Sequence, residues 1–267
     1  MINGLDLFSG YGGITIALAE WVRPVAYCEI ERYAQGILLS RMADGSIPVA
    51  PIWDDIATLD GRQFKGNVDI IYGGFPCQDL SVAGTGAGLE GSRSGLFFEI
   101  LRLANEVKPS FVFLENVPAI RTRGLDVVLY ELAEAGYDCR YSFLSAYDVG
   151  APHKRERWFL LGRRKDPAPH VVDAESLRRS KRRPGAEIRS RGNASPGPGE
   201  DVADTIDESG NTGKRETHWI IEPGICRVVN GCPFRVDRVK SLGNGVVPAQ
   251  ARAAFRRLLG CVNLRSN

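Results

Sequence analysis

Alternation between short apolar segments and longer helical segments is the feature of this chain that most constrains its fold. Residues 1–162 contain short apolar segments typical of buried strands, separated by segments with helical periodicity. We expect strands at 4–8, 24–28, 68–72, 110–114, 137–146 and 158–162, and helices at 14–22, 30–42, 96–107, 125–135 and 249–259. Strands that alternate with helices form a mostly parallel sheet covered on both faces. The sequence therefore predicts a doubly wound α/β fold.

Composition excludes several other classes of protein. The chain has 267 residues, of which 43% are hydrophobic and 25% charged, as in globular proteins with a substantial core. No uncharged apolar run reaches the roughly 18 residues that span a bilayer. The first apolar residues follow no basic segment of the kind found in secretory signals. We therefore expect a cytoplasmic protein with no membrane partner.

Cysteine and histidine spacing argues against a metal centre. The six cysteines include no Cys-x-x-Cys pair, and the three histidines show no zinc-ligand spacing. We expect free thiols, as in a reducing compartment, and no bound metal.

Basic charge is concentrated in one segment, although the whole chain carries a net charge of only +2. Residues 163–197 hold ten Lys or Arg and four Asp or Glu, so the rest of the chain has a net charge of −4. The segment also has four prolines and little apolar periodicity. It is either a phosphate-binding strip or a solubilising linker.

The first predicted strand ends in a glycine-rich turn, SGYGG at positions 9–13. A strand, such a turn and a helix together form a common nucleotide-binding arrangement. Glu29 follows the second predicted strand, where an acid can bind ribose hydroxyls. Thr15 replaces the third glycine of the dinucleotide fingerprint, which favours a nucleoside ligand such as S-adenosylmethionine. The alternative is a tight turn without a ligand.

Two reactive side chains follow later strands. Cys77 lies directly after GGFP at positions 73–76, at the carboxyl end of a buried strand. Open α/β sheets place their sites at this edge, although most free cysteines are simply buried. Glu115 follows the next strand, and in an apolar cleft its pKa would rise enough for it to act as a general acid. A solvated glutamate is the alternative.

Glycine and arginine mark two further segments. Residues 79–95 include five glycines, as in loops that act as lids. Arg155 and Arg157 precede a strand, and side-chain alternation along it would aim both guanidinium groups in the same direction. Charge runs of this kind are usually solvated.

Several blocks, taken in order, resemble the motifs of bacterial and phage DNA cytosine-C5 methyltransferases. They are DLFSGYGG at 6–13, Glu29, Asp55–Ile56, GFPCQ at 74–78 with Ser81, ENV at 115–117, RER at 155–157 and GNGVVP at 243–248. The segment SRSGLFF at 92–98 is similar to a family block whose arginine reaches DNA phosphate. The resemblance covers about 1–163 and 236–262.

The resemblance implies a Rossmann-like class I fold, dependent on S-adenosylmethionine, with a small irregular target-recognition domain. A catalytic domain would comprise 1–163 and 236–267, and a short basic target-recognition region 164–235. The implied activity is methyl transfer from S-adenosylmethionine to C5 of a flipped-out cytosine in duplex DNA, through a covalent adduct between cysteine and C6.

The resemblance also assigns residues. The implied catalytic residues are Cys77, Glu115, Arg157 and Arg155. The implied cofactor-binding residues are Phe8, Ser9, Gly10, Gly12, Gly13, Glu29, Ile30, Asp55, Ile56, Pro76, Asn244 and Val246. The implied DNA-binding residues are Gln78, Ser81 and Arg93. We expect a monomer, with a restriction endonuclease as a possible cognate partner.

The chain departs from the family pattern in three places. His153 stands where glutamine is common, the ninth motif is reduced to about 227–238, and the variable region is short. The last two departures leave the recognition sequence open. The alternatives are an RNA (tRNA) cytosine methyltransferase, against which Gln78 argues, and an inactive DNA-binding homologue, against which Cys77, Glu115 and Arg157 argue. A nicotinamide oxidoreductase fits poorly because of Thr15.

Overall fold

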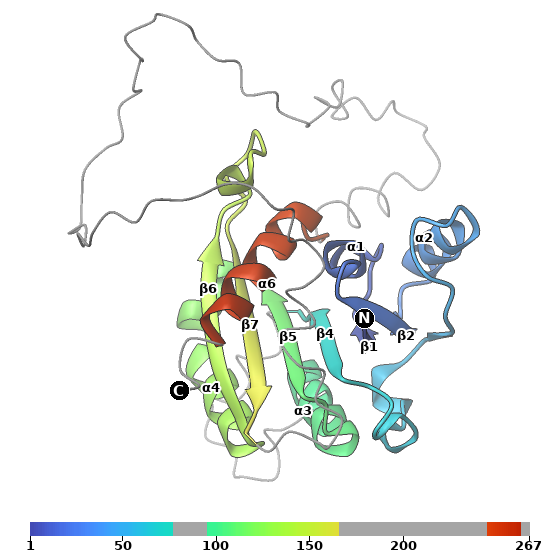
Figure 1. The fold of residues 1–267 in the computed structure, drawn as a ribbon, viewed down its shortest axis with the longest axis horizontal. Helices are drawn as coiled ribbons and strands as arrows, with labels where there is room; N and C mark the ends of the chain where they lie inside the picture. The colour runs from blue at the N-terminus through green and yellow to red at the C-terminus, as the bar shows by residue number, and fades with distance from the viewer. Residues whose placement is uncertain (77–94, 166–244, 263–267) are drawn as a thin grey trace, which may run out of the picture.

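A seven-stranded sheet with helices on both faces forms the core of the protein. The structure is a computed structural model that describes residues 1–76, 95–165 and 245–262 (Figure 1). The strands are β1 (Ile2–Leu7), β2 (Val22–Cys28), β3 (Ile52–Trp53), β4 (Ile70–Gly74), β5 (Phe111–Asn116), β6 (Tyr137–Leu144) and β7 (Arg157–Arg164), in the sheet order β3-β2-β1-β4-β5-β7-β6. The pairs from β3 to β5 are parallel, whereas β7 runs antiparallel to both of its neighbours. The predicted doubly wound α/β fold is confirmed.

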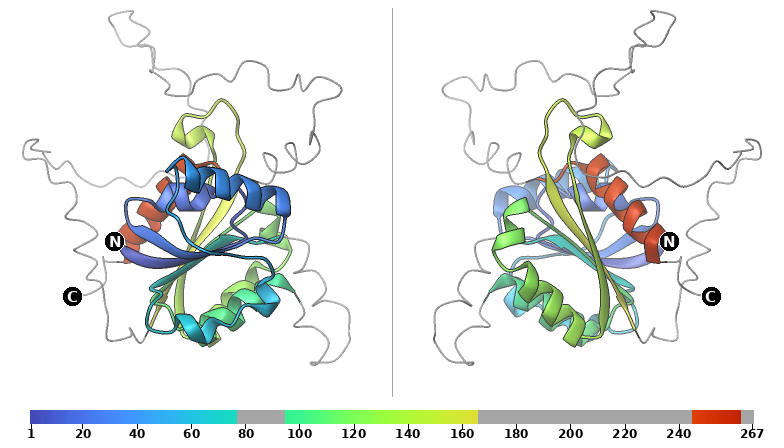
Figure 2. Two further views of the ribbon diagram at one scale, coloured as in Figure 1. Left: turned by 90° about the vertical axis from the view of Figure 1, so that its right-hand side faces the viewer. Right: turned by 90° about the vertical axis from the view of Figure 1, so that its left-hand side faces the viewer.

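The helices form two layers (Figure 2). They are α1 (Gly13–Leu18), α2 (Arg32–Ala43), α3 (Leu96–Val107), α4 (Leu125–Glu134) and α6 (Pro248–Val262), with 3-10 helices η1 (Ile56–Thr58), η2 (Gly61–Phe64), η4 (Pro118–Thr122) and η5 (Tyr147–Val149). α1, α2 and α6 lie on one face of the sheet, and α3 and α4 on the other. Among the described residues, no helix is long and apolar enough to cross a lipid bilayer.

Each helical layer has its own apolar core. α1 and α6 pack Leu18 and Phe255 against Tyr72 and Phe113 of the sheet. α3 has buried apolar residues at positions 97, 100, 103, 104 and 107, the spacing of a single helical face. That face packs against the sheet residues of the other layer. Burial of both sheet faces accounts for the continuous apolar runs of the central strands.

Sheet pairing shortened one predicted helix and added one strand that was not predicted. The expected helix at 14–22 ends at Leu18, because Val22 already pairs with Ile2 as the first residue of β2. The two-residue strand β3 was not predicted, since it is too short to show any periodicity. The remaining described strands and helices lie within a few residues of their predicted positions.

The fold gathers the ends of distant strands at one edge of the sheet. Parallel pairing sets Leu7 of β1 beside Cys28 of β2 and Gly73 of β4, and sets Gly74 beside Glu115 of β5. Because β7 is antiparallel, its first residues rather than its last reach this edge, and Trp158 lies beside Asn116. The segments that follow β1, β2, β4 and β5 therefore meet the beginning of β7.

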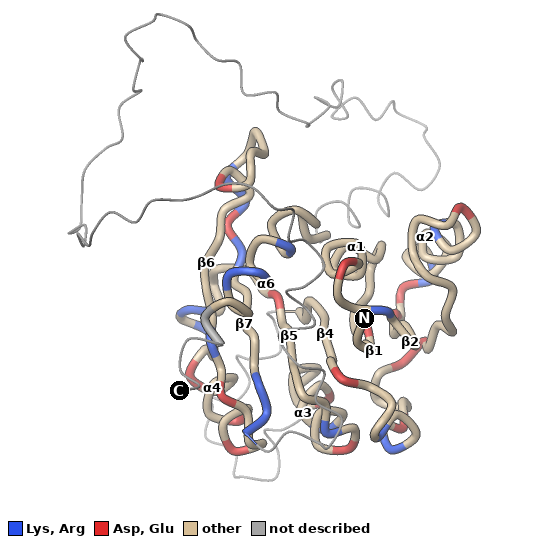
Figure 3. Tube along the Cα trace, in the orientation of Figure 1, with Lys and Arg blue, Asp and Glu red and all other residues tan. Residues whose placement is uncertain are grey.

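The basic segment predicted at 163–197 falls mostly outside the described residues, as do the glycine-rich segment 79–95 and the target-recognition region predicted at 164–235. The first three residues of the basic segment are described. Arg163 and Arg164 complete β7, and Lys165 Nζ lies 3.5 Å from Asp138 Oδ1. Figure 3 shows basic segments at both ends of β7. These three residues therefore lie at the end of β7 remote from Arg157. The division into a catalytic domain and a target-recognition region stays a prediction.

Candidate active site

A cavity of about 620 Å³ lies at the edge where these strand ends meet. Most of the described residues that the sequence assigned to a site line it: Phe8, Ser9, Gly10, Gly13, Glu29, Ile30, Asp55, Ile56, Pro76, Glu115, Arg157 and Val246. Gly12 and Arg155 are described but do not line the cavity. Cys77, Gln78, Ser81, Arg93 and Asn244 lie outside the described residues.

The glycine-rich turn forms one wall of the cavity. Gly10 and Gly12 have φ angles of 53° and 80°, in the left-handed region that favours glycine. The Gly12 amide closes the turn by donating to the Ser9 carbonyl at 2.7 Å. A side chain on Gly12 would contact Leu38 and Ile47 rather than a ligand. Gly12 therefore shapes the turn without reaching the cavity.

Glu29 fixes this turn from the end of β2. Its Oε2 accepts a hydrogen bond from the Gly10 amide at 2.7 Å, and its Oε1 accepts one from the Glu31 amide at 2.8 Å. The side chain is only 7% exposed. The Gly10 amide is thus bound by Glu29 rather than left for a ligand. Each carboxylate oxygen retains a further lone pair for a ligand hydroxyl.

Asp55 and Ile56 form the next part of the wall. Asp55 caps η1, its Oδ1 accepting from the Ala57 amide at 2.9 Å. Ile56 is buried, whereas Ile30 lies exposed across the cavity. Apolar side chains on two sides, with carboxylates at positions 29 and 55, suit an adenosyl group, whose flat base is apolar and whose edges donate hydrogen bonds.

Glu115 and Arg157 occupy the opposite part of the cavity. Arg157 Nε lies 3.0 Å from Glu115 Oε1, and the two side chains are 12% and 10% exposed. Gly74, the partner of Glu115 in β4, leaves room for this carboxyl group, since a Cβ there would lie 2.6 Å from Glu115 Oε2. Burial raises the pKa of Glu115 to about 7, although Arg157 and Arg155 oppose this rise. Glu115 can therefore hold or release a proton near neutral pH.

The strand alternation from which a shared direction of Arg155 and Arg157 was predicted does not include Arg155. β7 begins at Arg157, so side-chain alternation along the strand does not extend to Arg155. Arg155 has a φ angle of 29°, and its guanidinium donates to the carbonyl of Gly245. Burial and the neighbouring Arg157 lower the pKa of Arg155. Arg155 thus connects the site to the C-terminal segment, while Arg157 pairs with Glu115.

Gln250 holds this arrangement from the first turn of α6. It is fully buried, and its Nε2 donates to the carbonyls of Leu144 at 2.7 Å and Arg155 at 2.8 Å. These two carbonyls lie at the end of β6 and just before β7. The side chain therefore fixes both ends of the connection that carries Arg155.

Tyr11 joins the glycine-rich turn to the same C-terminal segment. Its hydroxyl donates to the carbonyl of Val246, and its ring packs where a side chain on Gly245 would lie. A Cβ on Gly13 would also come within 3.0–3.1 Å of Val246 and the Tyr11 ring. Sequence analysis missed Tyr11, although an aromatic residue between two glycines of a ligand-binding turn is a usable signal.

Asn116 is a second residue that sequence analysis did not assign to the site. Its Nδ2 donates to the Phe75 carbonyl at 3.0 Å, and its side chain is 2% exposed. This hydrogen bond fixes the end of the segment that leads through Pro76 to Cys77. Its position within the ENV block at 115–117 was the available signal.

Asp6 is a further carboxyl group at the cavity, and it explains Thr15. The Thr15 hydroxyl donates to Asp6 Oδ2 at 2.6 Å and lies 2.8 Å from the Tyr72 hydroxyl. Burial raises the pKa of Asp6 to about 8, and the nearby Glu29 adds to this effect. A glycine at position 15 would remove this hydrogen bond from the buried acid. Among the described residues, no group of three or more potential metal ligands occurs.

Solved structures of methyltransferases share this fold. Spodoptera frugiperda DNMT2, solved as a mutant, aligns with a TM-score of 0.51 and 22% identity over 65% of this chain and 54% of its own. The S. pombe Dnmt2 methyltransferase aligns with a TM-score of 0.51 and 23% identity over 68% and 57% of the two chains. The fold is the Rossmann-like fold of class I methyltransferases.

The sequence profile of the family described as C-5 cytosine-specific DNA methylase matches residues 2–222. The chain belongs to this family. It is 38% identical over 169 residues to the type II methyltransferase M.CviJI of Paramecium bursaria Chlorella virus IL3A, covering 63% of this chain and 45% of the relative. It is 36% identical over 167 residues to the type II methyltransferase M.HhaI of Haemophilus parahaemolyticus, covering 61% and 49%. The matched region thus spans about half the length of these relatives.

Proposed function

We propose that the protein transfers a methyl group from S-adenosylmethionine to C5 of a cytosine flipped out of duplex DNA. The observation that carries the proposal is the cavity. One part of it contains Glu29, an acid of the kind that binds ribose hydroxyls, and the other part contains the buried Glu115–Arg157 pair. Family membership supports the same assignment. A methyl donor and a pyrimidine base would meet between these two parts.

Cytosine C5 needs activation before it can accept a methyl group. The thiolate of Cys77 adds to C6, which breaks the aromaticity of the ring and makes C5 an enamine carbon. C5 then takes the methyl group, a base removes the C5 proton, and the bond from Cys77 to C6 breaks. The products are 5-methylcytosine, S-adenosylhomocysteine and a proton.

Glu115 has the protonation behaviour that this addition requires. As a carboxylic acid it donates to N3 of cytosine while its carbonyl oxygen accepts from the exocyclic amine. Proton donation to N3 neutralises the charge that develops when the thiolate adds. Arg157, which lies beside Glu115, binds the O2 side of the ring, and Arg155 assists from the neighbouring segment.

The cofactor part of the cavity is built to hold an adenosyl group. Bound S-adenosylmethionine supplies the methyl group as an electrophile. Glu29 would accept hydrogen bonds from the ribose hydroxyls, and Asp55 would accept one from the adenine amino group. Ile30 and Ile56, which line the cavity, would contact the base, and Val246 lines the cavity from the C-terminal segment.

DNA binding requires contacts that reach beyond the cavity. The target base is inaccessible inside a stacked duplex, so it must be flipped out at a cost of a few kcal/mol. We assign Gln78, Ser81 and Arg93 to contacts with the DNA around the flipped base. The basic residues of 163–197 that follow β7 would add salt-dependent phosphate contacts.

Covalent trapping tests the chemistry directly. An oligonucleotide with 5-fluorocytosine at the target position forms a stable adduct, because fluorine at C5 cannot leave as a proton does. The substrate is a randomised duplex library in the presence of S-adenosylmethionine, and the readout is a denaturant-resistant complex mapped by mass spectrometry. We expect the adduct at Cys77, its loss in Cys77→Ala, and its retention in Cys139→Ala. An adduct elsewhere, or turnover by Cys77→Ala, would overturn the assignment.

Bisulfite sequencing of DNA from cells that express the protein tests the substrate and reveals the sequence context. Parallel assays compare methyl incorporation into duplex DNA and into tRNA. Incorporation into tRNA alone would replace this proposal with the RNA methyltransferase alternative.

A further inference from the structure

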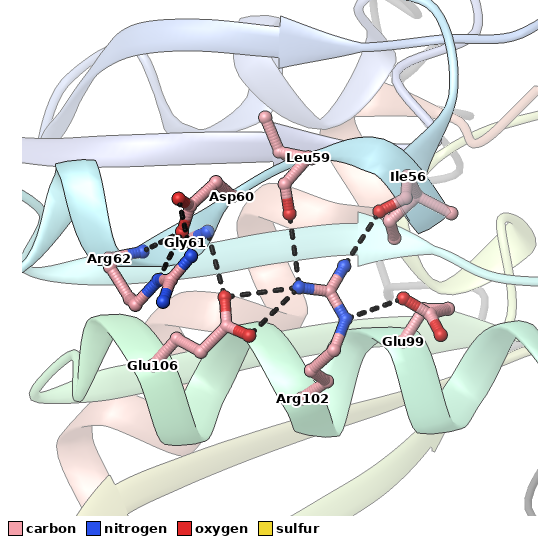
Figure 4. Close-up of polar contacts among 8 residues, drawn as sticks. All are labelled: Ile56, Leu59, Asp60, Gly61, Arg62, Glu99, Arg102 and Glu106. Carbon is pink, nitrogen blue, oxygen red and sulfur yellow. Dashed lines mark hydrogen bonds and ion pairs between the residues drawn. The ribbon is translucent and has the colours of Figure 1, made fainter.

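Arg102, in the middle of α3, forms a polar network outside the cavity (Figure 4). Its Nε donates to Glu99 at 2.7 Å, and its Nη1 donates to Glu106 at 3.0 Å. The same guanidinium group donates to two backbone carbonyls, those of Leu59 at 3.0 Å and Ile56 at 2.8 Å. One side chain thus binds two carboxylates of its own helix and two carbonyls of another segment.

The two carbonyls belong to the segment that forms the adenine side of the cavity. η1 runs from Ile56 to Thr58 and is followed by Leu59, so Arg102 binds the carbonyls at the beginning of this helix and just after its end. Asp55 and Ile56 line the cavity at the beginning of η1, where Arg102 binds. The Ile56 carbonyl also accepts from the Leu59 amide at 3.3 Å, so Arg102 gives it a second donor, and it gives the Leu59 carbonyl a donor from outside the helix.

Glu106 extends the contact between α3 and η1 to the beginning of η2. Its Oε2 accepts from the Gly61 amide at 2.8 Å, and a side chain on Gly61 would meet the same oxygen at 2.7 Å. α3 therefore holds both η1 and the beginning of η2. It also contributes Leu96 to the cavity lining. The distance between two walls of the cavity is set by this contact between α3 and η1.

Arg62 shows how the polar network of Arg102 differs from an ordinary ion pair on the surface. Arg62 lies in η2 and binds Asp60 through two hydrogen bonds of 2.9 Å, with 80% of its side chain exposed. Both of these hydrogen bonds are local, because Asp60 lies only two residues before Arg62. Arg102 is 31% exposed and its carbonyl partners lie 43 and 46 positions away in the sequence.

We infer that Arg102 is a positioning residue for adenine recognition, which acts through Asp55 and Ile56 without touching the ligand. This inference rests on the proposed use of S-adenosylmethionine and adds a residue to that site. When the two carbonyl contacts are lost, η1 can shift, and the Asp55 carboxylate no longer lies at a fixed distance from the adenine amino group.

The test compares two ligands that differ along one edge of the base. S-adenosylhomocysteine carries the amino group and an unprotonated N1, whereas S-inosylhomocysteine carries a carbonyl oxygen in place of the amino group and a proton on N1. Calorimetry gives the dissociation constants of both ligands for the wild type, Arg102→Met and the matched control Arg62→Met, and circular dichroism checks folding. A general loss of stability would weaken both ligands equally, whereas a displaced Asp55 weakens discrimination between them.

We expect the wild type and Arg62→Met to prefer S-adenosylhomocysteine by about tenfold or more, as expected for a charged hydrogen bond. Arg102→Met should bind this ligand about tenfold more weakly and lose the preference. Should Arg102→Met fail to fold, Arg102→Lys supplies the same comparison, because an ammonium group cannot span both carbonyls and both carboxylates.

Three results would count against the inference. Unchanged discrimination in a folded Arg102 variant would overturn it, and so would an equal loss in Arg62→Met. A wild type that binds both ligands equally would also overturn it, because no adenine recognition would exist to be positioned. A wild type that binds neither ligand would instead refute the proposed function.

Discussion

Two buried glutamates line the same cavity, and their surroundings give them different chemistry. Taken as whole residues, Glu29 and Glu115 are each 7% exposed; Glu29 directly follows β2, and Glu115 lies near the end of β5 in the same sheet. The carboxylate of Glu29 is held by two backbone amides, one on each oxygen. The carboxyl group of Glu115 faces the guanidinium of Arg157, and burial raises its pKa to about 7.

Under the proposed function, this difference would separate binding from catalysis within one cavity. Backbone amides cannot move independently of the fold, so Glu29 is a fixed acceptor that also shapes the glycine-rich turn. Glu115 exchanges a proton in the range where the reaction must run. We therefore expect substitution of Glu29 to change mainly the affinity for the cofactor, and substitution of Glu115 to change mainly the turnover.

The largest expected effect is that of Glu115→Gln. The amide cannot transfer a proton to N3, so turnover should fall by about a hundred- to ten-thousandfold. Affinity for S-adenosylhomocysteine should stay within about twofold of the wild type, because the cofactor part of the cavity is unchanged. Methyl incorporation and calorimetry measure the two quantities. A variant that kept turnover and lost cofactor affinity would reverse the roles of the two glutamates.

The pH profile provides a second check on Glu115. Since the protonated acid is the reactive form, wild-type turnover should decline as the pH rises above about 7, the pKa of Glu115. The residual activity of Glu115→Gln should lack this decline. An identical alkaline decline in both proteins would assign it to another group.

Glu29→Gln should produce the next largest effect. A carboxamide has one acceptor oxygen for the two amides of Gly10 and Glu31, so one buried N–H loses its partner at a cost of about 1–3 kcal/mol. The dissociation constant of S-adenosylhomocysteine should rise by about ten- to a hundredfold, while turnover at saturating cofactor changes only a few-fold. A large loss of turnover at saturation would show that the cofactor part also takes part in the chemistry.

Gly245→Ala should have a smaller effect, limited to the affinity for the cofactor. The added methyl group collides with the Tyr11 ring, which forms the wall between the glycine-rich turn and the C-terminal segment. We expect cofactor affinity to fall by about fivefold, since coupled contacts of this kind contribute about 1 kcal/mol. In a Tyr11→Ala background the same change should have less effect. Equal effects in both backgrounds would show that the two residues act independently.

Asp6→Asn should leave turnover almost unchanged and alter stability instead. Because burial raises the pKa of Asp6 from 3.8 to about 8, its protonated form is favoured in the folded state. The resulting stability is fully present below about pH 4 and is lost as the pH rises to about 8, by up to about 1.4 kcal/mol per pH unit.

Denaturant unfolding across this pH range measures that slope. Asn stays neutral, so the variant should show a shallower decline than the wild type. Asp126→Asn, which removes an exposed carboxylate, is the matched control. A decline as steep in Asp6→Asn as in the wild type would assign the proton to another buried group, such as Glu115.

Local pattern in the sequence predicted much of this architecture. The strand and helix periods are local properties, so the positions of Glu29 and Glu115 at the carboxyl ends of their strands could be read without a structure. Three-dimensional contacts between distant segments could not be read. The contact between Tyr11 and Val246 joins residues 235 positions apart, and Arg102 reaches carbonyls 43 and 46 positions away.

The strand alternation expected at Arg155 is absent for a local reason. Alternation along a strand predicts side-chain direction only where the backbone is extended, and the backbone at Arg155 is left-handed. Thr15 provides a contrast. Sequence analysis used it only as a missing glycine, whereas its hydroxyl is the partner of the buried acid Asp6.

Gln250 determines when the site becomes complete during synthesis. Strands β1 to β7 can pair once residue 164 has left the ribosome, but Arg155 lacks the amide that fixes its backbone until residue 250 follows. A nascent chain that already contains Glu29, Glu115 and Arg157 would therefore hold an unfinished site. Activity should begin only after α6 has been translated and has packed onto β6 and β7.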